Sequence, residues 1–87
     1  MQAAYRAGFP EADLADVAEL EARGEQAYAD MYEAPNSTAA AGCYNDAKDY
    51  FARAIGCAER AGLEAEAQRL RARNEHIIAV YRRQFGS

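Results

Sequence analysis

Large apolar side chains are scarce in this chain of 87 residues. Although 51% of the residues are hydrophobic, 22 of those 44 positions are alanine and only 20 carry a large apolar side chain. A chain of this length buries only about 60% of the surface that its unfolded form exposes, so it has room for one domain with a thin core. β-Branched residues are also few, whereas alanine, glutamate and arginine, which favour helices, are abundant. The composition therefore predicts an all-α domain.

The chain also lacks the basic surplus with which nucleic-acid-binding proteins displace counterions from phosphates. Its net charge of −4 argues against a nucleic-acid partner. The charge is uneven, because residues 11–33 contain eight acidic residues against one arginine, while residues 63–85 contain five arginines against three glutamates. This asymmetry favours either antiparallel packing between the two segments or a charged partner, and the sequence leaves both open.

Targeting and membrane signals are missing as well. The sequence has no run of about 18 apolar residues, no apolar leader after Met1 and no lipidation motif. We therefore expect a cytoplasmic protein without a membrane partner. Cys43 and Cys57 fall on one expected helix, fourteen residues and about 21 Å apart, which is too far for a disulfide between them. Both are expected to be free thiols.

The spacing of the apolar residues predicts an antiparallel three-helix bundle. We expect helices over residues 11–33, 39–61 and 63–85, which form a single domain, 11–87, after a loose N-terminal arm at residues 1–10. In the first helix, apolar residues recur at spacings of three and four around Gly24; they are Leu14, Val17, Tyr28 and Met31, with Leu20, Ala27 and Tyr32 widening the stripe. Gly24 is either a weak point of that helix or a place where another helix approaches closely.

Turn residues separate the three helices. Pro35 ends the first helix, and Ser37 or Thr38 is expected to cap the second. Gly62 has the position of a C-terminal helix glycine, and the third helix begins directly after it, which predicts a tight corner. The middle helix carries two apolar stripes, one through Tyr44, Ala47, Phe51, Ala54, Ile55 and Ala58, and one through Cys43, Ala47, Tyr50, Ala54, Cys57 and Ala61. We expect this helix to be covered on more than one side and to lie in the middle of the bundle.

The middle helix also carries a family resemblance. Gly42, Tyr44, Ala47, Phe51 and Ala54 match the pattern Gly-x-Tyr-x-x-Ala-x-x-x-Phe-x-x-Ala, so residues 24–61 resemble the helical hairpin of a tetratricopeptide repeat. The run from Tyr28 to Phe85 is also similar to small bacterial proteins of this tetratricopeptide-repeat-like type. These resemblances imply a helix pair followed by a C-terminal helix, and they imply no activity. The pattern itself is steric, because its alanines allow a neighbouring helix to approach and its aromatic residues fill the space beside it.

Several elements of a catalytic or metal site are missing. His76 is the sole histidine, and positions 72 and 80, one turn away on either side, are alanine and valine. The cysteines form no Cys-x-x-Cys motif, and the chain has no Glu-x-x-His pair, glycine-rich phosphate loop or nucleophile motif. We therefore expect no enzymatic activity, no metal and no cofactor. The arginines at positions 69, 71 and 73 are interpreted as an exposed helix surface rather than a phosphate site.

Aromatic residues, by contrast, exceed what a thin core can enclose. The chain has six tyrosines, a residue type that is enriched at protein interfaces. In the third helix, Asn74 interrupts the apolar stripe, where an amide can fix register or association, or can bond a tyrosine hydroxyl of the first helix. The candidate packing and interaction residues are Tyr28, Tyr32, Tyr44, Tyr50, Phe51, Asn74, Tyr81 and Phe85.

Two functional hypotheses follow from these residues. The leading one is a non-enzymatic protein–protein interaction module, whose partner is a second copy of the chain in a homodimer or another protein. The alternative is a small-molecule or thiol-based sensor, with a cavity beside Tyr44, Tyr50 and Cys57 or with the thiol of Cys43 as its reactive group.

Overall fold

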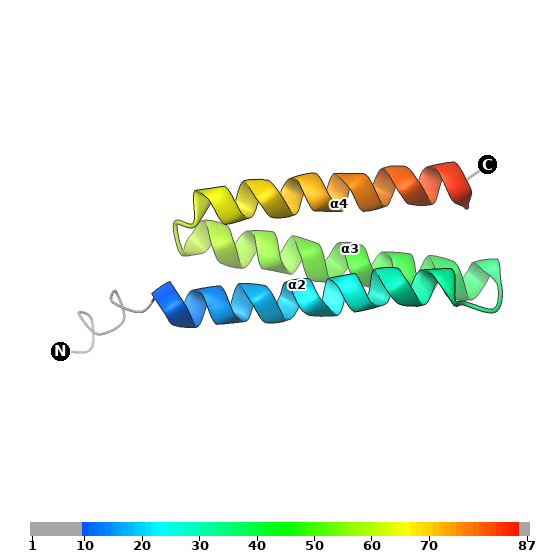
Figure 1. Cartoon of the computed structure of the whole chain (residues 1–87), viewed down its shortest axis with the longest axis horizontal. Coiled ribbons are helices and arrows are strands. Elements are labelled where there is room, and N and C mark those ends of the chain that lie inside the picture. Colours follow the sequence, from blue (N-terminus) through cyan, green and yellow to red (C-terminus); the bar gives the residue numbers. More distant parts are fainter. Residues whose placement is uncertain (1–9, 86–87) are drawn as a thin grey trace.

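A computed structural model describes residues 10–85 of the chain, which form three helices (Figure 1). They are α2 (Pro10–Tyr32), α3 (Ser37–Arg60) and α4 (Glu64–Gln84). Consecutive helices are antiparallel, and α3 packs against both of the others, so the prediction of an antiparallel three-helix bundle with the middle helix at its centre is confirmed. The helix boundaries lie within two residues of the predicted ones. The predicted loose arm at residues 1–10 falls outside the described residues, apart from Pro10, which begins α2.

The start of α3 is capped by Asn36, so the prediction of Ser37 or Thr38 as the cap was wrong. Asn36 has an extended backbone, and its side-chain oxygen accepts a hydrogen bond of 2.8 Å from the backbone N–H of Ala39. This is the geometry of an N-cap, in which a short side chain satisfies a helix N–H that has no partner within the helix. Ser37 already belongs to the helix, so it cannot serve as the cap.

The corner between α3 and α4 has the form that the sequence predicts. Gly62 has a φ of 76°, in the left-handed region that a glycine adopts without steric cost. The backbone N–H of Leu63 donates to the carbonyl of Ala58 at 2.8 Å, and that of Gly62 donates to the carbonyl of Glu59 at 3.0 Å. These two bonds form a Schellman motif, which ends α3 and reverses the chain within a few residues.

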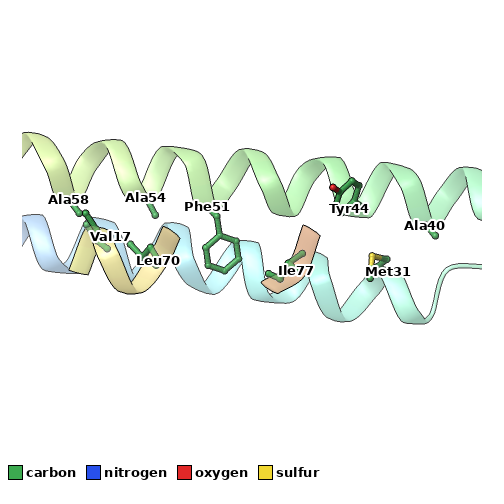
Figure 2. Close-up of a cluster of buried hydrophobic side chains, with 10 residues drawn as sticks. Val17, Met31, Ala40, Tyr44, Phe51, Ala54, Ala58, Leu70 and Ile77 are labelled. Atoms are coloured by element: carbon green, nitrogen blue, oxygen red, sulfur yellow. The ribbon is translucent and has the colours of Figure 1, made fainter. Parts of the chain in front are cut away.

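The core is a single layer of side chains that lies between the helices (Figure 2). Its largest fully buried side chains are Phe51, Met31, Leu70, Ile77 and Val17. Small residues complete it at positions where two helices approach, namely Ala40, Ala47, Ala54, Ala58 and Ala67. The expected core is thus confirmed as thin, with alanines between the few large side chains.

Gly24 of α2 lies directly against the ring of Phe51, which belongs to α3. A Cβ atom at position 24 would lie 2.7 Å from Cδ2 and 2.7 Å from Cε2 of that ring. Of the two interpretations of Gly24, the close approach of another helix is therefore the one that the structure shows. The packing of Phe51 depends on the absence of a side chain at this position.

Two residues of the expected α2 stripe are not buried. Leu14 and Tyr32 keep 42% and 48% of their surface exposed. Both lie about 80° from the core-facing line through Val17 and Met31, at 100° per residue, on the side of α2 that faces α4. Their place in the core was predicted wrongly, because the narrow core accommodates only the centre of the stripe.

The helices α2 and α4 run in the same direction, since each is antiparallel to α3 (Figure 1). Antiparallel packing between the acidic and the basic segment, one of the two explanations of the charge asymmetry, was therefore wrong in direction. The two backbones have little direct contact. Long charged and aromatic side chains span the distance between them, and these side chains form the first candidate surface.

Candidate interaction surfaces

Five aromatic rings form a continuous row across α2, α4 and α3, which we call the aromatic row. Tyr28 meets Tyr32 edge-on at 5.5 Å between ring centroids, and their hydroxyl oxygens lie 3.3 Å apart. Tyr32 lies 6.2 Å from Phe85, and Phe85 lies 5.3 Å from Tyr81. Tyr81 then stacks on Tyr44 at 3.8 Å with an interplanar angle of 4°. The structure thus brings together five of the eight candidate residues.

A cation lies over the ring at each end of the aromatic row. The guanidinium carbon of Arg73 is 5.1 Å from the centroid of Tyr28, and Nζ of Lys48 is 4.5 Å from the centroid of Tyr44. A cation over an aromatic face contributes about 0.5–1 kcal/mol at exposed sites. These contacts restrict the two terminal rings, so the aromatic row is already organised in the free chain.

Burial changes along the aromatic row. Tyr44 is buried, while Tyr28, Tyr81 and Phe85 are half-buried, and Tyr32 is exposed. One end of the row is therefore anchored in the core, and the rest faces solvent near the ends of α2 and α4. This combination of a fixed base and an open face is typical of aromatic anchors at protein interfaces.

Two arginine–glutamate pairs join α2 and α4 beside the aromatic row. Arg69 donates to both carboxylate oxygens of Glu21 at 2.8 Å, and Arg73 donates to those of Glu25 at 2.7 and 2.8 Å. Both pairs bridge positions 48 residues apart, one helical turn after the other, as two parallel helices in a fixed register require. Bidentate geometry makes such pairs stronger than single contacts. Two of the three arginines that we expected to form an exposed helix surface, Arg69 and Arg73, thus hold α4 onto α2.

The ion pairs shift the pKa values of Glu21, Arg69 and Arg73. The hydrogen bonds from Arg69 lower the pKa of the Glu21 carboxyl below its usual value, although partial burial opposes this. The hydrogen bonds to Glu21 raise the pKa of Arg69, and those to Glu25 raise the pKa of Arg73. Burial, followed by the hydrogen bond with Tyr32, raises the pKa of Tyr28. At neutral pH the Glu21–Arg69 pair is therefore fully charged, and Tyr28 keeps its proton.

Stability is expected to fall in acid through Glu21. Because its pKa is lower in the folded protein, the unfolded chain binds more protons on acidification. The stabilisation is complete above the usual glutamate pKa of about 4.3 and is lost as the pH falls through the folded value. In urea unfolding between about pH 3 and 7, Glu21→Gln is expected to flatten this dependence. Glu33→Gln, which changes an exposed glutamate outside the ion pairs, serves as the control, and equal profiles for the two variants would contradict the assignment.

A groove lies between α2 and α3, and every residue that lines it belongs to one of these two helices. Its volume is about 520 Å³. It is lined by Asp16, Glu19, Leu20 and Arg23 of α2 and by Ala52, Arg53, Gly56, Cys57 and Arg60 of α3. A smaller hollow of about 270 Å³ shares Arg23 with it and is lined also by Gln26, Ala27, Asp30, Asp46 and Tyr50. The two form the second candidate surface, which we call the α2–α3 groove.

The remaining candidate residues lie apart from the aromatic row. Phe51, one of the candidate packing and interaction residues, is fully buried in the core and has a packing role there, because its volume fills the space beside Gly24. Tyr50 lines the α2–α3 groove, with the guanidinium carbon of Arg53 5.7 Å from its ring centroid. Asn74 does not bond a tyrosine of α2 through its carbonyl oxygen, because this buried oxygen has no hydrogen-bond partner in the structure. The proposed tyrosine bond was therefore wrong for that atom.

The chemically reactive residues are spread over different surfaces. His76 is exposed on α4, and Cys43 and Cys57 are half-buried free thiols on α3. Across the described part of the chain, no group of three or more histidine, cysteine, aspartate or glutamate residues is arranged to hold a metal ion. Arg71 forms an ion pair with Glu59 of α3, a partner that helix-periodicity reasoning did not consider.

Comparison with known proteins gives no relative: no family model, no curated protein and no solved structure matches this chain. The tetratricopeptide-repeat-like pattern in residues 24–61 therefore stays a resemblance. Within residues 10–84, none of the helices has the length and hydropathy needed to cross a membrane.

Proposed function

We propose that this chain is a non-enzymatic protein–protein interaction module that acts in the cytoplasm. Its partner is another protein or a second copy of the chain, which contacts the exposed part of the aromatic row. The observation that carries the proposal is the exposure of Tyr32, a large aromatic side chain with 48% of its surface in solvent, next to three half-buried rings. Tyr32 is not one of the buried core residues. Aromatic side chains contribute much of the binding energy at protein interfaces.

The surroundings of the aromatic row support a contact role. Arg73 and Lys48 hold its two ends, and the bidentate pair of Arg73 with Glu25 fixes the helix that carries Tyr81 and Phe85. An organised surface loses little conformational entropy on binding, which favours affinity. The rings present apolar faces, and the tyrosine hydroxyls present polar edges. We infer that the row accepts an apolar or aromatic side chain of a partner segment.

The proposal predicts that Tyr32→Ser weakens partner binding. Peptides selected from a displayed random library on the full chain are expected to bind it, and in calorimetry Tyr32→Ser is expected to lose about tenfold or more in affinity, as truncation of an interface anchor does. Ala29→Ser, which changes another exposed residue of α2, serves as the matched control and should bind like the unmodified chain. Failure to select any peptide, or equal affinity for both variants, would overturn the proposal.

A thiol-based sensor is the second candidate, and the position of Cys57 favours it. This half-buried cysteine lines the α2–α3 groove together with Arg23, Arg53 and Arg60. Tyr50 lines the adjoining hollow, whereas Tyr44 packs in the core away from it. Thiol titration of the native protein separates the two candidates. Rapid reaction of Cys57, accompanied by loss of peptide binding, would favour the sensor. Two unreactive cysteines would exclude the sensor hypothesis.

A further inference from the structure

The α2–α3 groove contains an apolar seam at heptad spacing. Cys43, Tyr50 and Cys57 follow one another every seven residues on α3, and Leu20 and Ala27 do so on α2. Leu20, Ala27, Tyr50 and Cys57 line the groove, whereas Cys43 does not, and all five are partly or largely buried. Leu20, Cys43 and Cys57 also touch the core. Heptad spacing is the pattern by which helices pack against partner helices along a seam. The second apolar stripe of α3 is therefore only half covered by α2.

The two walls of the groove differ in charge at the end near Arg60. The α2 wall carries Asp16 and Glu19, and the α3 wall carries Arg53 and Arg60. Glu19 pairs with Arg23, and Arg53 pairs with Asp49, each within its own helix. Among residues 14–85, Asp16 and Arg60 form no ion pair with another residue. One wall thus offers an unpaired acid and the other an unpaired base at the same level of the bundle.

We propose that a second copy of this chain docks in the α2–α3 groove, so that two α2–α3 hairpins form an antiparallel four-helix bundle about a twofold axis parallel to the helices. A twofold interface uses the same surface on both partners, so the groove must complement itself. This axis places α2 of one copy against α3 of the other at the same level. Asp16 then faces Arg60 of the other copy, and the contact occurs twice.

Charge favours this arrangement over the second twofold arrangement in which the two grooves face each other. A twofold axis perpendicular to the helices would set the two α2 helices against each other and bring their acidic walls together. The residues at the floor of the groove, Gly56 and Ala52, are small, but the Arg60 guanidinium lies beside Gly56, 3.3 Å from where a Cβ would be, and must turn away for a partner helix to approach there. Asp30 and Asp46 face each other at the far end of the interface, so the contact is expected to be tightest at the Asp16–Arg60 end.

Sedimentation equilibrium of the full chain tests this inference, which concerns a different surface from the aromatic row. Between about 5 and 200 µM, the mass should rise from that of the 9.5 kDa chain towards twice that value. Asp16→Arg or Arg60→Glu should weaken the dimer about tenfold or more, because each reversal acts twice in the interface. The double variant Asp16→Arg/Arg60→Glu restores opposite charges and should regain a dissociation constant within about threefold of the original. Arg82→Glu, an equal charge reversal on α4, should leave it unchanged.

Circular dichroism of each variant shows that its helices are retained, since all the altered residues are exposed. A strictly monomeric chain, or a double variant without recovery, would overturn the inference. A dimer that Tyr32→Ser abolishes and the charge reversals spare would also overturn it, while it would support the aromatic row as the contact surface. Peptide binding by a monomeric chain would leave the proposed function standing without the groove dimer.

Discussion

Phe51→Ala is expected to remove most of the stability of this domain. Phe51 is the largest of the fully buried side chains and packs against α2 beside Gly24 (Figure 2). Truncation of a buried phenylalanine costs about 3–5 kcal/mol, from the lost burial and the cavity left behind. Small domains have roughly 0.05–0.15 kcal/mol of stability per residue, which for this chain amounts to about 4–13 kcal/mol. Thermal unfolding followed by circular dichroism should show a variant that is largely unfolded or melts far below the unmodified chain.

Tyr32→Ala is the matched control for Phe51→Ala, because it removes an aromatic ring of similar size from an exposed position. Its side chain is 48% exposed, so the loss of apolar burial is much smaller. We expect a destabilisation of about 1 kcal/mol or less. Equal losses at positions 51 and 32 would contradict the placement of Phe51 in the core.

Gly24→Ala is expected to destabilise the protein, even though alanine is the better helix former. Alanine in a helix interior gains about 1 kcal/mol over glycine. The new Cβ would lie 2.7 Å from two carbon atoms of the Phe51 ring, where carbon atoms normally approach to about 3.5–4.0 Å. Overpacking of this kind costs about 1–3 kcal/mol, so the net loss should reach up to about 2 kcal/mol. Urea unfolding gives this value directly.

Gly42→Ala is the matched control for the change at position 24, because Gly42 also lies inside a helix. A Cβ at position 42 would have no atom within 4 Å. We therefore expect this variant to be more stable than the unmodified chain by about 0.5–1 kcal/mol. Stabilisation by both variants would mean that Phe51 can move aside, and would contradict a close approach at Gly24.

The number, order and core faces of the helices could be predicted from the sequence. Their apolar residues repeat at helical spacing, and Pro35 and Gly62 mark the breaks between them. The end of α3 follows from local backbone chemistry at Gly62 alone. The start of α3 was predicted less accurately, because Asn36, Ser37 and Thr38 are all good capping residues and only the backbone conformation at Asn36 distinguishes them.

The candidate surfaces could be predicted only in part. Six tyrosines indicated exposed aromatic area, but composition does not show that Tyr32 of α2 meets Phe85, which in turn contacts Tyr81 of α4. The Glu21–Arg69 and Glu25–Arg73 pairs left a signal that we did not use. The two glutamates lie four residues apart on α2, and the two arginines lie four residues apart on α4. Two parallel helices in register require this equal spacing.

The thin core connects the fold with the proposed function. Several large side chains are only partly buried or exposed here, and the structure arranges many of them in two places, the aromatic row and the α2–α3 groove. Such organised apolar surface is more consistent with a contact role than with scattered exposure. We therefore propose that the exposed part of the aromatic row binds a protein partner.

Nuclear magnetic resonance of the ¹⁵N-labelled full chain, titrated with a peptide selected on it, tests this claim most directly. We expect saturable chemical-shift changes at the backbone amides of the exposed and half-buried rings, namely Tyr28, Tyr32, Tyr81 and Phe85. The amide resonances of Ala47 and Ala54 in the core should not change. Shifts confined to other surfaces of the described helices, with those of the aromatic row unchanged, would contradict it.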